Sequence, residues 1–195
     1  SNEKSEKKQS NYIYESRTEY DIDGKKNFDI KLGGAYAVDL KAYHGEKIEV
    51  AMFSNVYKNL MADYKVKIDD IKNRIDIDLN RFNEASEADA KESLVITIFI
   101  PVKYIGKIEL SVNAGTLNIT DIENEHIEVN GKISEVTLQG NKSEIEIDSN
   151  LDMQISVLSH EGALEINQLS ATSRLTLPAD YRFRSTKKGI ATHIY

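Results

Sequence analysis

The sequence contains no cysteine and no tryptophan, and only two prolines in 195 residues. Without cysteine the chain can form neither a disulfide framework nor a thiolate metal site or nucleophile. No apolar run approaches the roughly 18 residues that cross a bilayer as a helix. The most apolar stretch, residues 94–102 (LVITIFIPV), is far shorter and predicts a buried strand that ends near Pro101, which cannot donate a hydrogen bond to a neighbouring strand.

Basic residues are too few to balance the acidic ones, and the deficit lies in one stretch. The whole chain has a net charge of −7, whereas residues 105–170 hold twelve acidic residues and three lysines, a net charge of −9. A surface this acidic repels phosphate backbones, so we expect no nucleic-acid partner. The simplest interpretation of these acids is a solvated surface that resists aggregation.

The first ten residues, SNEKSEKKQS, contain no apolar side chain. This composition predicts disorder, and we expect residues 1–11 to precede a single all-β domain over residues 12–195. No signal peptide is present. The segment is then either a frayed terminus or, as we favour, a flexible membrane tether whose export signal or lipid anchor has been removed. The tether predicts a domain that is extracellular or attached to the cell envelope.

Residues 12–104 alternate between apolar and polar side chains and are interrupted by turn residues, which predicts N-terminal strands. The alternation is clear over residues 28–32 (FDIKL), and residues 64–79 predict a hairpin. Residues 55–62 have the apolar spacing of one or two helical turns. The polar residues 81–93 predict an exposed loop insert.

A different pattern begins at residue 105 and continues to residue 190. Short apolar-x-apolar units recur there, separated by glycine or asparagine, and their first members lie 8 to 11 residues apart. The eight units are Ile108/Leu110, Leu117/Ile119, Ile127/Val129, Val136/Leu138, Ile145/Ile147, Met153/Ile155, Leu164/Ile166 and Leu175/Leu177. This spacing fits a β-sandwich as well as a β-solenoid.

Two absences favour the solenoid. No aromatic residue occurs from Ile105 to Asp180, so the inward side chains have the uniform size that stacked rungs need. No proline lies between Pro101 and Pro178, so every strand can donate to neighbours on both sides. We therefore predict an all-β fold with a single-stranded, right-handed β-solenoid or β-helix-like repeat and irregular N-terminal strands, and keep the β-sandwich as the alternative.

Two stretches resemble the bacterial putative adhesin family of domains of unknown function. In residues 94–122, LVITIFIPVKYIGKIELSVNAGTLNITDI, a strand ending at a proline is followed by short strands with a Gly-x-apolar-x-apolar pattern. In residues 164–190, LEINQLSATSRLTLPADYRFRSTKKGI, a Leu-Pro segment precedes a Ser-x-x-x-Gly-apolar turn. The resemblance covers roughly residues 28–190 and implies a mostly parallel, β-helix-like fold. The family has no catalytic residues to carry over.

No local motif indicates catalysis, a metal or a cofactor. The histidines are His44, His126, His160 and His193, and none of them lie at the i, i+2 or i, i+4 spacing of a zinc site. No serine has the context of a catalytic nucleophile. Residues 21–24 resemble the start of a calcium loop, but the sixth position is lysine and the twelfth is leucine, where that loop requires glycine and glutamate. We therefore predict a chain that is not an enzyme.

The candidate binding residues are four acids, Glu128, Glu144, Glu146 and Glu165. Each lies beside inward apolar residues and should point outward from its strand. If the units stack in register, these carboxylates form an acidic strip with a spacing of about 4.8 Å, in which each raises the pKa of its neighbours. Such a strip could bind calcium or a cationic ligand, or serve a polysaccharide-cleaving groove.

Three functions fit these observations. The first is an exported, adhesin-like surface module that presents flat, repetitive faces to a glycan or a cell-surface protein. The second is a carbohydrate-active β-helix enzyme, which needs two acids about 5 to 10 Å apart in a groove. The third is an envelope sensor or regulatory ectodomain. Because the repeat carries no catalytic motif, the surface module is the function that the sequence favours.

Overall fold

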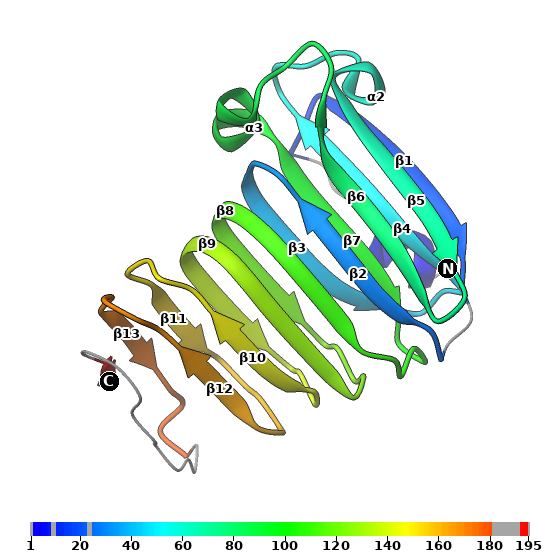
Figure 1. Cartoon of the computed structure of the whole chain (residues 1–195). Helices are drawn as coiled ribbons and strands as arrows, with labels where there is room; N and C mark the ends of the chain where they lie inside the picture. Colours follow the sequence, from blue (N-terminus) through cyan, green and yellow to red (C-terminus); the bar gives the residue numbers. More distant parts are fainter. Residues whose placement is uncertain (1, 9–10, 23–24, 181–191, 195) are drawn as a thin grey trace.

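The computed structural model describes residues 2–8, 11–22, 25–180 and 192–194, and these confirm the all-β prediction (Figure 1). The strands are β1 (Tyr14–Asp21), β2 (Asn27–Leu32), β3 (Ala35–Tyr43), β4 (Lys47–Ser54), β5 (Tyr64–Ile71), β6 (Arg74–Phe82), β7 (Val95–Pro101), β8 (Ile108–Thr120), β9 (His126–Gln139), β10 (Glu144–Asp148), β11 (Gln154–Val157), β12 (Leu164–Asn167), β13 (Ser173–Thr176) and β14 (Thr192–Ile194). The helices of the described residues are α1 (Asn2–Glu6), α2 (Leu60–Asp63) and α3 (Glu87–Ser93). None of them is long and apolar enough to cross a bilayer.

All these strands join one mixed sheet, which is arranged in two layers (Figure 1). The long strands β8 and β9 belong to both layers. Their first halves pair with β2 and β10, and their second halves pair with β3 and β11. We call β5-β6-β2-β8-β9-β10-β12 the front layer and β1-β4-β7-β3-β8-β9-β11-β13-β14 the back layer. Buried aliphatic side chains of both layers form the main core.

The strands from β8 onward pair in parallel and in register. The aligned core residues are Ile108, Ile127 and Ile145 in the front layer and Leu117, Val136 and Ile155 in the back layer. Each of these six side chains is at most 1% exposed, and aligned residues lie 18 or 19 positions apart in the sequence. One structural repeat therefore contains two of the predicted apolar units, one for each layer.

Antiparallel pairing is confined to the N-terminal part of the described chain. There β4 lies between β1 and β7, and β5 pairs with β6 as the predicted hairpin. The other strand pairs of the described residues are parallel, including β3 with β7 and β2 with β6. The first hundred residues thus form less regular strands, against which the repeats stack.

Helix α3 corrects the prediction of an exposed loop over residues 81–93. The Ser86 hydroxyl accepts a hydrogen bond from the Asp89 amide at 3.2 Å, and the Asp89 carboxylate accepts one from the Ser86 amide at 2.9 Å. This capping box satisfies two amide groups at the start of the helix. Ala90 is fully buried against the core. Because α3 is short and Ala90 is its one buried residue, its composition is as polar as that of a loop. Composition alone therefore does not predict this helix.

Residues 2–8 differ from the disorder predicted for residues 1–11. They include α1, and Lys7 Nζ lies 3.4 Å from Glu49 Oε1. Arg17 Nη1 lies 2.9 Å from the other carboxylate oxygen of Glu49, which is only 2% exposed. A carboxylate that is this deeply buried needs cationic partners. The polar composition of the segment gave no indication that an acid on β4 would attract one of its lysines.

Candidate functional site

Outward side chains of the front layer form a continuous row of carboxylates. Side chains alternate between the two faces of a strand, so a residue between two buried aliphatic positions points outward. In register order, the row consists of Asp69, Asp76, Asp29, Glu109, Glu128, Glu146 and Glu165. It crosses the front layer from β5 to β12 with the usual inter-strand spacing of about 4.8 Å. We call this set the carboxylate row.

Three of the four predicted binding residues belong to this row. Glu128, Glu146 and Glu165 occupy neighbouring strands, whereas Glu144 lies two positions earlier on β10 and pairs with His126. The members that the sequence analysis did not include are Asp29, Asp69, Asp76 and Glu109. They join the row because β2, β5 and β6 pair with the repeats across long sequence separations, which no local pattern encodes.

Lysine and arginine side chains neutralise one end of the carboxylate row, whereas at the other end the basic partner is His126, whose Nε2 lies 3.8 Å from Glu146 Oε2. Arg74 Nε lies 2.7 Å from Asp76 Oδ1, and Lys67 Nζ lies 3.3 Å from Asp69 Oδ2. Within the described part of the chain, no lysine or arginine forms an ion pair with the row's four glutamates, Glu109, Glu128, Glu146 and Glu165. Negative charge is therefore concentrated over β8, β9, β10 and β12.

Glu146 lies at the centre of this charge. Its side chain is 25% exposed, and Asn167 Nδ2 donates hydrogen bonds to Glu146 Oε1 at 3.0 Å and to Asp148 Oδ1 at 2.7 Å. Burial raises the pKa of the Glu146 carboxyl, and repulsion from Asp148, Glu128 and Glu165 raises it further. Repulsion from stacked carboxylates, which the sequence predicted, is thus the second cause of the raised pKa of Glu146.

Glu146 should make stability depend weakly on pH. Its pKa is higher in the folded chain than in the unfolded chain, so the folded state takes up this proton first as the pH falls, and the destabilisation by the charged form disappears. We expect Glu146→Gln to raise the unfolding temperature at neutral pH, where the natural carboxylate is charged. In mild acid the natural Glu146 is protonated, so the two chains should unfold at similar temperatures. The gain should stay below about 1 kcal/mol because the group is partly exposed. Thermal unfolding in a chelator across this pH range tests it, and a lower unfolding temperature at neutral pH would contradict it.

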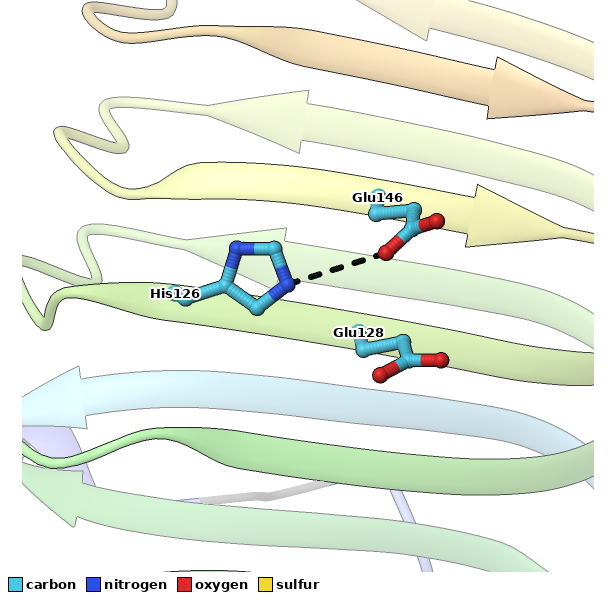
Figure 2. Close-up of side chains that lie close together, drawn as sticks. All are labelled: His126, Glu128 and Glu146. Carbon is cyan, nitrogen blue, oxygen red and sulfur yellow. Dashed lines mark ion pairs between the residues drawn. The ribbon is translucent and has the colours of Figure 1, made fainter.

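A histidine lies beside the carboxylate row. His126 Nε2 is 3.8 Å from Glu146 Oε2, and His126 Nδ1 is 3.7 Å from Glu144 Oε2. Figure 2 shows His126 and Glu128 on one strand and Glu146 on the next. Donor atoms of His126, Glu128 and Glu146 all lie within 4.8 Å of one another. The search for local metal motifs missed this group because it is assembled by strand pairing.

The back layer carries a row of different chemistry at the equivalent outward positions. Its members in register are Thr97, Asp39, Asn118, Thr137, Ser156 and Thr176. The one acid, Asp39, accepts hydrogen bonds from Asn118 Nδ2 at 2.7 Å and from Thr97 Oγ1 at 3.4 Å. This row consists mainly of hydroxyl and amide groups, so the strong negative field belongs to the front layer.

Two surface hollows are lined by residues outside the carboxylate row. One lies beside the start of α3, where Glu87 is its acidic residue, and includes Lys31, Asn113 and Asn130. The other is lined by residues 158–162 with Pro178 and Asp180. No member of the carboxylate row lines either hollow. The acids of the row are exposed or half-buried, and they line neither of these hollows.

The fold and this face define an all-β module with a charged, repetitive surface. The chain is similar to a putative cell adhesion protein from Clostridium sporogenes, with a TM-score of 0.53 and 10% identity over 92% of this chain and 94% of that chain. A putative adhesin from Bacteroides fragilis matches with a TM-score of 0.31 and 10% identity, over 93% of this chain and 97% of that chain.

The first of these likenesses shows a shared fold. The resemblance to the bacterial putative adhesin family that the sequence predicted is thus confirmed at the level of the fold. No protein-family model matches the sequence, and no curated protein matches it. The particular role of the chain therefore has to be inferred from its own surface.

Proposed function

We propose that this chain is an exported, adhesin-like module of the cell surface, in which a β-solenoid presents the carboxylate row to a partner. The in-register pairing of β8, β9 and β10 supports the solenoid, since each repeat of 18 or 19 residues returns to the same position one strand further along. The similarity to a putative cell adhesion protein supports the surface role.

The observation that carries this proposal is the glutamate end of the carboxylate row, which no lysine or arginine of the described residues neutralises. Glu109, Glu128, Glu146 and Glu165 present four negative charges in a line on one open face. The complementary partner is a lysine-rich segment of another surface protein, whose flexible side chains can reach successive carboxylates. Each exposed ion pair contributes less than about 1 kcal/mol, so several must act together, and binding should weaken as salt is added.

Immobilised poly-L-lysine is a suitable probe of this face. The test variant replaces all four glutamates of the glutamate end with glutamine: Glu109→Gln, Glu128→Gln, Glu146→Gln and Glu165→Gln. At low salt and with a chelator present, we expect it to bind poly-L-lysine at least about tenfold more weakly than the natural chain. Surface plasmon resonance measures this difference directly.

A matched control separates the arrangement of the charges from their number. It replaces four exposed glutamates that lie off the row: Glu84→Gln, Glu92→Gln, Glu135→Gln and Glu161→Gln. Both variants have the same net charge, and we expect the control to keep most of its binding. Equal losses in the two variants would show that poly-L-lysine responds to net charge alone, and the proposed face would be abandoned.

The proposed role is binding and not catalysis. A glycosidase needs two acids that flank a bond in a groove, whereas the acids of the carboxylate row lie along an open face and line neither hollow described above. The enzyme and the envelope sensor remain the competing functions. Release of reducing ends from a polysaccharide, lost in Glu128→Gln and Glu146→Gln, would replace the binding proposal with the enzyme.

A further inference from the structure

We propose that His126, Glu128 and Glu146 bind a divalent transition-metal ion of the zinc class. One donor atom of each residue lies within 4.8 Å of the donor atoms of the other two (Figure 2). The three side chains belong to β9 and β10, whose parallel pairing places Glu146 directly opposite Glu128 and fixes their positions. This inference goes beyond the basic partner proposed above and does not depend on it.

The imidazole of His126 distinguishes this group from the rest of the carboxylate row. Oxygen-only sites suit magnesium and calcium, whereas imidazole nitrogen suits zinc, copper, iron and nickel. Zinc sites with three protein ligands combine histidine with carboxylates and leave one position for water or for a ligand from outside. The donor set therefore favours zinc over the calcium that an acidic strip alone would suggest.

The donors of His126 and Glu146 are spaced closely enough to share one ion. His126 Nε2 and Glu146 Oε2 are 3.8 Å apart, which is too long for a hydrogen bond. Two ligands of a tetrahedral zinc ion lie about 3.3 Å apart, given metal–ligand distances near 2 Å. A shift of less than about 1 Å in the two side chains would place both atoms on one ion.

Neighbouring groups orient the donors. Asn167 Nδ2 donates to Glu146 Oε1 at 3.0 Å, which leaves Oε2 directed at the imidazole. Glu144 Oε2 lies 3.7 Å from His126 Nδ1, on the opposite side of the ring from Nε2. At 3.7 Å this pair is also too long for a hydrogen bond, but if Glu144 moves closer to accept one from Nδ1–H, it would favour the imidazole form whose Nε2 is free to bind a metal. Asn167 and Glu144 are thus positioning residues for the two ligands.

Titration of the whole, chelator-treated chain with Zn²⁺ by isothermal calorimetry tests the site. We expect saturable binding of one ion, weaker binding of Ca²⁺, and at least about tenfold weaker zinc binding in both His126→Gln and Glu146→Gln. Zn²⁺ should also raise the unfolding temperature of the natural chain but not that of His126→Gln. Unfolding of each variant without metal verifies that it folds.

Two control variants make the test specific. Glu165→Gln removes the same charge from the next strand of the row but supplies none of the three donors. His44→Gln removes another histidine beside a carboxylate, Glu6 Oε1 at 3.0 Å. We expect both controls to bind zinc like the natural chain. No saturable zinc binding, full binding by His126→Gln, or equal weakening by Glu165→Gln and Glu146→Gln would overturn the site. The poly-L-lysine assay contains a chelator, so either proposal can fail alone.

Discussion

Gly131→Ala is expected to destabilise the folded chain by about 3 kcal/mol or more. Gly131 lies within β9, opposite Val112 of β8, and has a φ angle of +136°, which side chains of L-residues rarely adopt. A Cβ atom at this position would lie 1.9 Å from the Val112 carbonyl oxygen. Because the obstructing atom belongs to the backbone of a paired strand, no side-chain rotation can relieve the clash.

Chemical denaturation of Gly131→Ala measures this loss, and Gly115→Ala is its matched control. Gly115 lies within β8 and has no positive φ angle, and a Cβ there would lie 3.0 Å from the Tyr36 carbonyl oxygen. We expect Gly115→Ala to change stability by less than about 1 kcal/mol. Similar stabilities for the two variants would mean that β9 can change direction without the backbone conformation described for Gly131.

Asn141→Ala is expected to cost about 3 kcal/mol. Asn141 is 1% exposed and lies between β9 and β10. Its Oδ1 accepts a hydrogen bond from the Ile122 amide at 3.0 Å, and its Nδ2 donates one to the Ile119 carbonyl at 2.9 Å. Alanine would leave buried backbone groups without these partners, and each unsatisfied group costs about 1–3 kcal/mol.

Asn150→Ala provides the comparison for Asn141→Ala. The Asn150 side chain also accepts a backbone hydrogen bond, from the Leu169 amide at 3.2 Å, but Asn150 is exposed and water can replace it. We expect its loss to cost about 1 kcal/mol or less. Equilibrium unfolding of both variants gives the difference. Equal losses would indicate that burial of the Asn141 amide does not determine its contribution.

The aliphatic repeat could be predicted because its pattern is local. Ile127 and Val129 flank Glu128, and alternation along one strand is enough to place the two aliphatic side chains inside and the acid outside. The doubling of the repeat could not be predicted in this way. The apolar units of both layers recur at the same spacing along the sequence, so the spacing does not tell which layer a unit joins. That depends on where a strand bends, as β9 does near Gly131.

The candidate site was predictable only where its residues share the repeat. Glu128, Glu146 and Glu165 follow from stacking equivalent units, but Asp29 enters the row through the pairing of β2 with β6 and β8. His126 lies at no zinc-site spacing from another histidine, and its partner Glu146 is distant in the sequence, so no local motif includes it. Strand pairing brings Asp29 into the row and His126 beside Glu146, and a single sequence does not show which strands pair.

The parallel register also affects how such a chain can change during evolution. In-frame duplication of one repeat would insert a further turn that pairs with the same partners on either side, because each repeat contacts only its neighbours. The stack would lengthen by about 4.8 Å, and the front face would gain one more carboxylate without loss of the existing ones. The length of the stack and the number of carboxylates that can bind a ligand therefore both depend on the number of repeats. A single duplication changes both together.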